Sequence, residues 1–232
     1  MYFKYVFSIL LLLIISSLVF AHHGKDFIVT ETTELPKAKS FWLILSGDFG
    51  AAEQFNSKLA VFEFTPGILY GISNSFAIEA HPHLGKEENE DFSYEATGFQ
   101  LRYNLPNLRS RFQIGLSSEY EIASKSGHKN LLDLRLIIAT ETENYKIVLN
   151  GGIESEEETS FVTRFGIVSN IFGNQSFAVE LLAKFGDDTN VDIIPSWTYK
   201  TNNDHTLRLG LGISADEERP FLSLRSILIF SL

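Results

Sequence analysis

The chain has 232 residues, no cysteine and a formal net charge of -10, and 44% of its residues are hydrophobic. This net charge argues against nucleic acid as a partner, because nucleic-acid binders need a basic face, and against docking on anionic lipid head groups through a polybasic patch. A secreted fold without cysteine cannot depend on disulfides, and this length fits one barrel, one sandwich or two small domains.

Residues 1–21 have the pattern of a secretory signal peptide. Lys4 gives a positive start, residues 6–20 form an almost unbroken apolar run, and Ala21 ends a plausible cleavage tripeptide. The run is shorter than the roughly 18 residues of a membrane-spanning helix, so we favour a cleaved signal over an uncleaved anchor.

Cleavage after Ala21 leaves His22 and His23 at the new N-terminus, where an amine and an imidazole together suit copper or zinc. A solvated polar leader is the competing interpretation, and the one we favour, because the spacing fixes no third ligand. Residues 22–39 have no steady hydrophobic period. We expect them to form a periplasmic leader or a small plug for the domain that follows, residues 40–232.

From about Ser40 onward, the chain repeats an alternating run of about ten residues and then a short polar break. In the clearest run, residues 111–123, Phe112 and Leu116 lie on one face and Glu119 lies on the other. A period of two predicts β-strands, and ten residues is the length of a tilted strand that crosses a bilayer. The expected strand cores are 40–49, 60–72, 75–84, 93–105, 110–123, 130–140, 145–154, 159–170, 175–186, 190–200, 205–215 and 220–232.

Three prolines fall inside predicted strands. Pro66, Pro82 and Pro195 each remove one hydrogen bond from the ladder, so we expect β-bulges at these positions.

The connections between the predicted strands alternate between two kinds. One series holds tight-turn residues, as at 73–75 and 202–204. The other series, which includes 85–91 and 216–219, is more highly charged and mostly acidic. Acidic outer loops are suited to recruit divalent cations at a lipopolysaccharide surface, although ordinary solvated loops have the same composition and are the interpretation we favour.

The last predicted strand places apolar residues at alternate positions, from Leu222 through Phe230 to Leu232. Together with the signal peptide, the ten-residue strands and the two kinds of connection, this resembles the bacterial outer-membrane β-barrel class. The resemblance implies an all-β fold, a single antiparallel up-and-down transmembrane barrel of about 12 strands, with 10–14 tolerated. It also implies a Gram-negative outer-membrane location, with outer-membrane lipids and a barrel-assembly machinery as partners.

A secreted β-sandwich is the rival fold, because its strands also alternate. Aromatic residues near strand ends, such as Phe112, Tyr145 and Phe161, suit the two interfaces of a membrane. The opposite strand faces carry charged residues, as a barrel lumen does, and these two features favour the barrel.

The charged faces give the candidate site residues. Both signs are interspersed, so these residues either pair and fill the lumen or line a small wet pore, and Gly115, Gly166, Gly210 and Gly212 leave room for a path. The lumen or constriction candidates are Arg102, Glu119, Glu121, Asp133, Arg135, Lys184 and Arg208.

A second candidate site lies on the strand at 75–84, where Glu79, His81 and His83 share one face. Such a group can bind a metal or form a pH-sensitive constriction. Ordinary hydrogen bonding inside the lumen is the alternative, and the one we favour, because no second cluster is obvious in the sequence.

The function predicted from these patterns is a narrow passive channel for small polar solutes. A closed structural or surface-interaction barrel is the alternative, and a lipid-active outer-membrane enzyme is a third. The sequence has no nucleophile elbow, zinc-protease motif or phosphate loop, so no catalytic residue and no cofactor is predicted.

Overall fold

The computed structural model describes residues 26–51, 60–86, 91–106, 111–124, 128–156, 158–186, 189–201, 204–215 and 220–232. The predicted signal peptide and the proposed metal ligands His22 and His23 lie outside the described residues. The same holds for much of the acidic connections that we considered for divalent cations.

Twelve strands make up the fold. They are β1 (Phe41–Ala51), β2 (Ala60–Ser73), β3 (Phe76–Lys86), β4 (Ser93–Asn104), β5 (Phe112–Ala123), β6 (Leu131–Glu141), β7 (Tyr145–Ser155), β8 (Thr159–Phe172), β9 (Gln175–Phe185), β10 (Asn190–Lys200), β11 (Thr206–Ala215) and β12 (Pro220–Ser231). Each matches one predicted alternating run, because period two is the direct consequence of the pleat.

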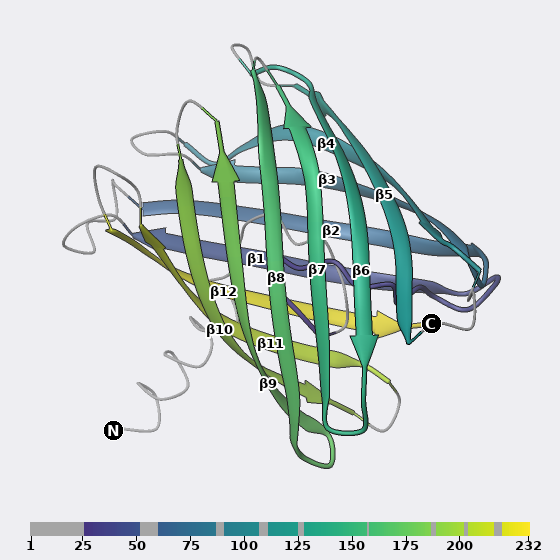
Figure 1. Cartoon of the computed structure of the whole chain (residues 1–232). Coiled ribbons are helices and arrows are strands. Elements are labelled where there is room, and N and C mark those ends of the chain that lie inside the picture. Colours follow the sequence, from purple (N-terminus) through teal and green to yellow (C-terminus); the bar gives the residue numbers. More distant parts are fainter. Residues whose placement is uncertain are drawn as a thin grey trace, which may run out of the picture.

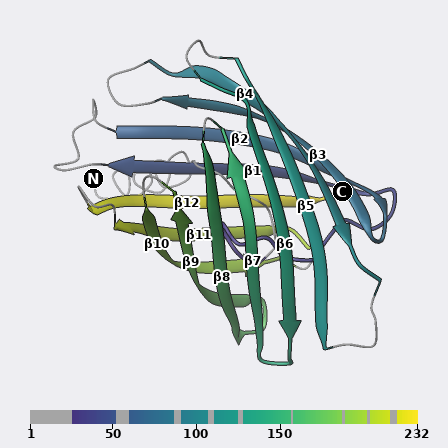
Figure 2. The same ribbon diagram turned by 45° about the horizontal axis from the view of Figure 1, so that its top comes forward.

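Every strand pairs antiparallel with its sequence neighbours, and β1 also pairs with β12, which closes the barrel (Figures 1 and 2). The predicted twelve-stranded up-and-down barrel is therefore confirmed, and the rival sandwich is wrong. The chain enters β1 and leaves β12 at the end that also carries tight turns such as 74–75 and 173–174. We call this the turn end and the opposite end the loop end.

The expectation of a bulge at each proline is wrong for two of the three. Pro66 pairs with Leu45 and Pro195 pairs with Val179, and both strands stay in register past the proline. A register shift does occur next to Pro82, between His83 and Leu84. Pro66 and Pro195 thus each pair with a residue of one neighbouring strand and have no assigned pair on the other neighbouring strand. Losing this pair distorts the sheet less than an inserted residue would.

The two faces of the wall have opposite chemistry. Leu116, Leu134 and Leu181 point outward and are 40–46% exposed, whereas Glu119 and Arg135 point inward and are at most 4% exposed. A continuous apolar outer surface of this extent is unfavourable in water and matches the hydrocarbon of a bilayer.

Aromatic side chains mark both ends of the outer face. Phe112 and Tyr145 begin β5 and β7 at the turn end, and Phe161 and Phe185 lie at the loop end with their rings 6.4 Å apart. All four are exposed. Aromatic rings in these two positions form the girdles expected at the two membrane interfaces.

Arginine placed on the outer face tests this orientation. Leu136 lies at the middle of β6 and Leu132 near its loop end, and the two are 42% and 39% exposed. We expect Leu136→Arg to reduce the unfolding free energy in lipid by about 2–4 kcal/mol, and Leu132→Arg by about 1 kcal/mol or less, because the cost falls toward the interface. Urea titrations of the refolded barrel in vesicles measure both, and equal losses would contradict a lipid-facing β6.

Residues 26–36, which we call the inner segment, lie inside the barrel. Phe27, Ile28 and Val29 are at most 2% exposed, and Glu31 is fully buried. The segment then meets the turn end of the wall, where the Lys39 backbone N–H donates to the Gly71 carbonyl at 2.7 Å, before β1 begins. Along the sequence, the chain therefore passes through the lumen first and then enters β1, the first strand of the wall.

Candidate functional site

The turn-end half of the lumen contains two apolar clusters that pack around the inner segment. Ile28 and Val29 belong to one cluster with wall side chains from five strands, and Phe27 belongs to a second. The wall members are Trp42, Ile44, Leu69, Ala77, Ile194, Ile227 and Ile229 in the first cluster, and Ile137, Ala139, Val148, Val168 and Ala178 in the second. Full burial of each large apolar side chain contributes about 1.5–3 kcal/mol, so the segment is held by a true core.

The expectation that wall glycines leave an open path fails at the turn-end half. A Cβ on Gly166 would lie 2.5 Å from Phe27, and a Cβ on Gly210 would overlap Ile28. The inner segment therefore occupies the space that these two glycines provide.

Glu180 of β9 anchors the apex of the inner segment. Its carboxylate accepts the backbone N–H of Ile28 at 2.6 Å and those of Val29 and Thr30 at 2.8 Å each. Glu180 is fully buried. One carboxylate thus accepts hydrogen bonds from three consecutive backbone N–H groups that belong to no β-ladder. Hydrogen bonds to an ionised acceptor are stronger than those between neutral groups.

Glu31 connects the segment to the opposite wall. Its carboxylate accepts hydrogen bonds from Arg135 and, at 2.7 Å, from Gln100 Nε2. Asn150 brackets its backbone, accepting the Glu31 N–H at 2.8 Å and donating to the Glu31 carbonyl at 3.0 Å. Arg135 also binds Asp133. Polar wall residues therefore contact the segment where the apolar clusters end.

Asp26 holds the start of the inner segment near the turn end. Its carboxylate pairs with Lys146 and, at 2.7 Å, with Lys200, while Lys146 also binds Glu34 at 2.6 Å. Burial alone would raise the pKa of Asp26, but the two ammonium groups outweigh it and hold the pKa below its ordinary value. This stabilisation is fully present above about pH 4 and is lost as the pH falls toward the lowered pKa.

The loop-end half of the lumen contains a cavity of about 610 Å³. Val29 forms part of its boundary, so the inner segment lies at its base. Charged side chains of both signs line it, with carboxylates in the majority: Glu63, Glu95, Glu121, Asp133, Glu154, Glu156 and Asp192, with Lys86, Lys129, Arg164, Lys184 and Arg225. Many are paired, as in Lys184 with Glu154 and Arg225 with Asp48 at 2.8 Å.

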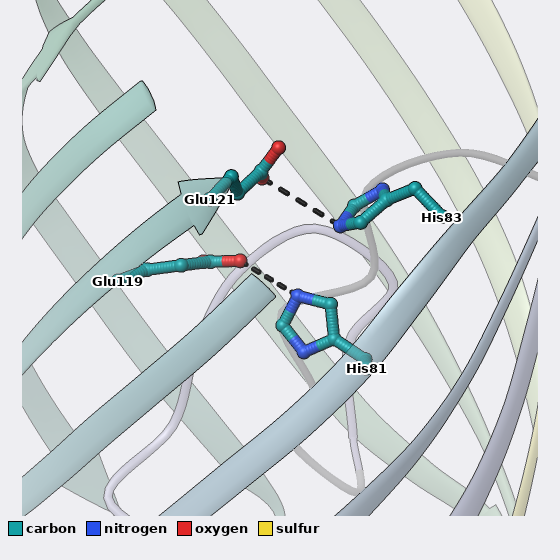
Figure 3. A group of neighbouring side chains, drawn as sticks. All are labelled: His81, His83, Glu119 and Glu121. Atoms are coloured by element: carbon teal, nitrogen blue, oxygen red, sulfur yellow. Dashed lines mark hydrogen bonds and ion pairs between the residues drawn. The ribbon is translucent and has the colours of Figure 1, made fainter. Parts of the chain in front are cut away.

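Beside this cavity, His81 and His83 of β3 face Glu119 and Glu121 of β5 (Figure 3). His81 Nε2 lies 2.8 Å from Glu119 Oε1, and His83 Nε2 lies 3.7 Å from Glu121 Oε1. β4 separates the two strands, and its Gly98 lies under the His81 ring, where any Cβ would overlap the imidazole. The missing side chain allows the imidazole to reach across β4.

The structure divides the sequence-predicted site residues into three groups. His81 and His83 join Glu119 and Glu121 in one cluster, while Glu79 lies behind it, 3.4 Å from both His81 Nδ1 and Arg102 Nη2. Asp133 and Lys184 line the loop-end cavity, and Asp133 also pairs with Arg135. Arg208 is fully buried and donates to Thr198 at 3.2 Å.

Sequence reasoning missed the contacts of the inner segment, and with them the roles of Asn150 and Glu31. A signal was present in the runs 41–45 and 227–230, which are apolar at every position. A strand that is apolar on both faces must bury its inward face against something, which predicts a filled lumen at that level.

No protein-family model matches this sequence, and no curated protein sequence matches it either. Among solved structures, an outer membrane channel from Pseudomonas putida F1 has a TM-score of 0.62 at 11% identity, covering 85% of this chain and 98% of that one. A NanC porin has a TM-score of 0.61 at 12% identity, covering 82% and 100%. A KdgM porin in complex with disordered oligogalacturonate has a TM-score of 0.60 at 12% identity, covering 82% and 99%. The chain thus has the fold of bacterial outer-membrane porins over their full length.

Proposed function

We propose that this protein is an outer-membrane channel for small polar or charged solutes, and that its inner segment acts as a plug on the periplasmic side. The observation that carries the proposal is the division of the lumen. A charge-lined cavity of about 610 Å³ lies in the loop-end half, and among the described residues the eleven-residue inner segment occupies the turn-end half. The similarity in fold to porins supports the same assignment.

The proposed location follows from the outer face. Its apolar surface and two aromatic girdles suit a bilayer, and an even number of strands puts both ends of the barrel domain on one side. In barrels of this class the short turns face the periplasm. The inner segment therefore enters the lumen from the periplasm, and the charged cavity lies toward the outside.

The nature of the solute follows from the cavity wall. Fixed charges at close quarters select by electrostatics, and here side chains of both signs line the cavity. Small polar, zwitterionic or ionic solutes fit such a wall, whereas an apolar solute would have to displace water from paired charges.

A closed structural barrel is the second candidate function. The observation in its favour is the apolar packing of Phe27, Ile28 and Val29, because a segment held by a true core has reason to stay in place. In this case the charged cavity would be a surface depression rather than one end of a path.

Conductance through a variant that lacks residues 26–36 separates the two functions. We expect the intact chain to give rare or small currents in planar bilayers and the deletion variant to give frequent stepwise currents, because removal of the segment vacates the turn-end half. A synthetic peptide of residues 26–36, added on the periplasmic side only, is expected to suppress them. A deletion variant that shows folded gel mobility but stays silent would reject the channel and favour the structural barrel.

A further inference from the structure

We infer that His81, His83, Glu119 and Glu121 form a binding site for one divalent transition-metal ion, with Zn²⁺ as the best match. The four residues come as two pairs, each at positions i and i+2 of one strand, so that all four side chains point into the lumen. One ligand atom from each lies within 4.8 Å of the others. Figure 3 shows the two pairs directed toward one another.

The distances leave room for an ion. Four ligands at Zn²⁺ bond lengths lie about 3.3 Å apart in a tetrahedron. His83 Nε2 and Glu121 Oε1 are 3.7 Å apart, already close to this value. His81 Nε2 and Glu119 Oε1, at 2.8 Å, share a hydrogen bond whose proton a metal would replace. The remaining adjustment to one ion falls to rotations of the glutamate side chains, since the four ligand atoms already lie within 4.8 Å of one another.

Two further carboxylates orient the imidazoles in the manner of metal sites. His83 Nδ1 lies 2.8 Å from Glu63 Oε1, and His81 Nδ1 lies 3.4 Å from Glu79 Oε1. An Nδ1–H that faces a carboxylate leaves the Nε2 lone pair directed away from it, toward the facing glutamate. Histidine ligands of metal ions characteristically have such an outer carboxylate, which fixes the ring and increases its basicity.

The carboxylates in and around the cluster are buried. Glu63, Glu79, Glu119 and Glu121 are 1–8% exposed. Among the described residues, the Arg102 guanidinium lies 3.4 Å from Glu79, so positive charge already meets one of these carboxylates. Buried carboxylates are costly without compensating positive charge, and a divalent ion supplies it. Two imidazoles with carboxylates favour zinc or a similar transition metal over calcium or magnesium, which take oxygen ligands.

An ion can reach the site from the outside. Glu63, His83 and Glu121 also line the loop-end cavity, so the ligands form part of its wall. The site therefore stands independently of whether the inner segment ever leaves the lumen. A bound ion would link β3 to β5 across β4 and would neutralise the two ligand carboxylates on the lumen wall.

Zinc binding by the full-length barrel tests the inference. The protein is purified in detergent without a histidine tag, stripped with chelator, and carries His22→Ala and His23→Ala so that the N-terminus does not contribute. Calorimetric titration with ZnCl₂ is expected to give one ion per chain. Binding should weaken at least tenfold in Glu121→Gln and in His81→Ala, and should be unchanged in the matched controls Glu154→Gln and His205→Ala. Ca²⁺ and Mg²⁺ should bind far more weakly than Zn²⁺.

Cobalt provides a second measurement that does not depend on stability. Co²⁺ in a compact four-ligand site gives intense visible absorption, which should appear with the stripped protein and disappear in His83→Ala. Each variant is first shown to keep folded, heat-modifiable gel mobility. Zinc affinity that is equal in the parent and in Glu121→Gln, or a cobalt spectrum of the hexahydrated ion, would overturn the site.

Discussion

Replacement of Glu180 by alanine is expected to open the barrel without shortening the chain. The substitution leaves the backbone N–H groups of Ile28, Val29 and Thr30 without the carboxylate that now accepts all three. Each hydrogen bond to a charged acceptor contributes about 1.5–3 kcal/mol, so even partial loss shifts the docked segment by about 3 kcal/mol or more. Since 1.4 kcal/mol is about tenfold in an equilibrium, the fraction of undocked segments should rise at least a hundredfold.

Two measurements report the rise in the fraction of undocked inner segments. Single-channel recordings should show openings that are far more frequent than in the intact chain, and limited trypsin digestion should cut more quickly at Lys37, next to the segment. Glu154→Gln is the matched control, because Glu154 also lies on the lumen wall but pairs with Lys184 at the loop end. Undiminished docking in Glu180→Ala would show that the apolar clusters hold the segment on their own.

The strands and their faces were predictable because one physical rule fixes both. Successive side chains of a strand point to opposite sides, so Leu134 beside Arg135 in the sequence already places one outside and one inside. The single barrel was predictable from the same alternation. Every predicted strand has one apolar face, which in a membrane barrel lies against lipid. The prolines were harder, because a missing ladder bond at Pro66 and Pro195 is tolerated without an inserted residue.

The site was only partly predictable, because it depends on contacts between strands that are not adjacent in the sheet. His81 and His83 were grouped by their spacing, but the partner carboxylates lie on β5, two strands away. Their meeting depends on the register of β3 against β4 and of β4 against β5, and on the absence of a side chain at Gly98. A one-residue change of register would turn one pair outward.

The inner segment was the least predictable element. Residues 26–36 have no period, because the segment forms no regular ladder and its backbone is satisfied by wall side chains such as Glu180 and Asn150. A segment of this kind takes its shape from the cavity that surrounds it. Only the wall strands carry a sign that the segment docks. Ile227 and Ile229 point inward, although a water-filled lumen would favour polar side chains at these positions.

Arg135 should be the most sensitive single residue for stability. It is 4% exposed and pairs with Glu31 of the inner segment and with Asp133 of its own strand, which are 0% and 3% exposed. Arg135→Leu keeps the bulk but removes the guanidinium that pairs with the fully buried Glu31 carboxylate, which also accepts hydrogen bonds from the neutral donors Gln100 and Ser117. Removal of one partner from a buried pair costs about 3–5 kcal/mol.

The double variant Arg135→Leu/Glu31→Leu shows whether the stability lost in Arg135→Leu comes from the broken ion pair with Glu31 or from altered packing. Replacement of both buried partners by apolar groups is often nearly neutral, so the double variant should recover most of the stability that Arg135→Leu loses. The measurement is the urea concentration at which the refolded barrel loses its heat-modifiable mobility. Arg111→Leu, at an exposed position beside β5, is the surface control and should change little. If the double variant were as unstable as Arg135→Leu alone, Glu31 would not be the partner that matters, and the loss would belong to Asp133 on the wall.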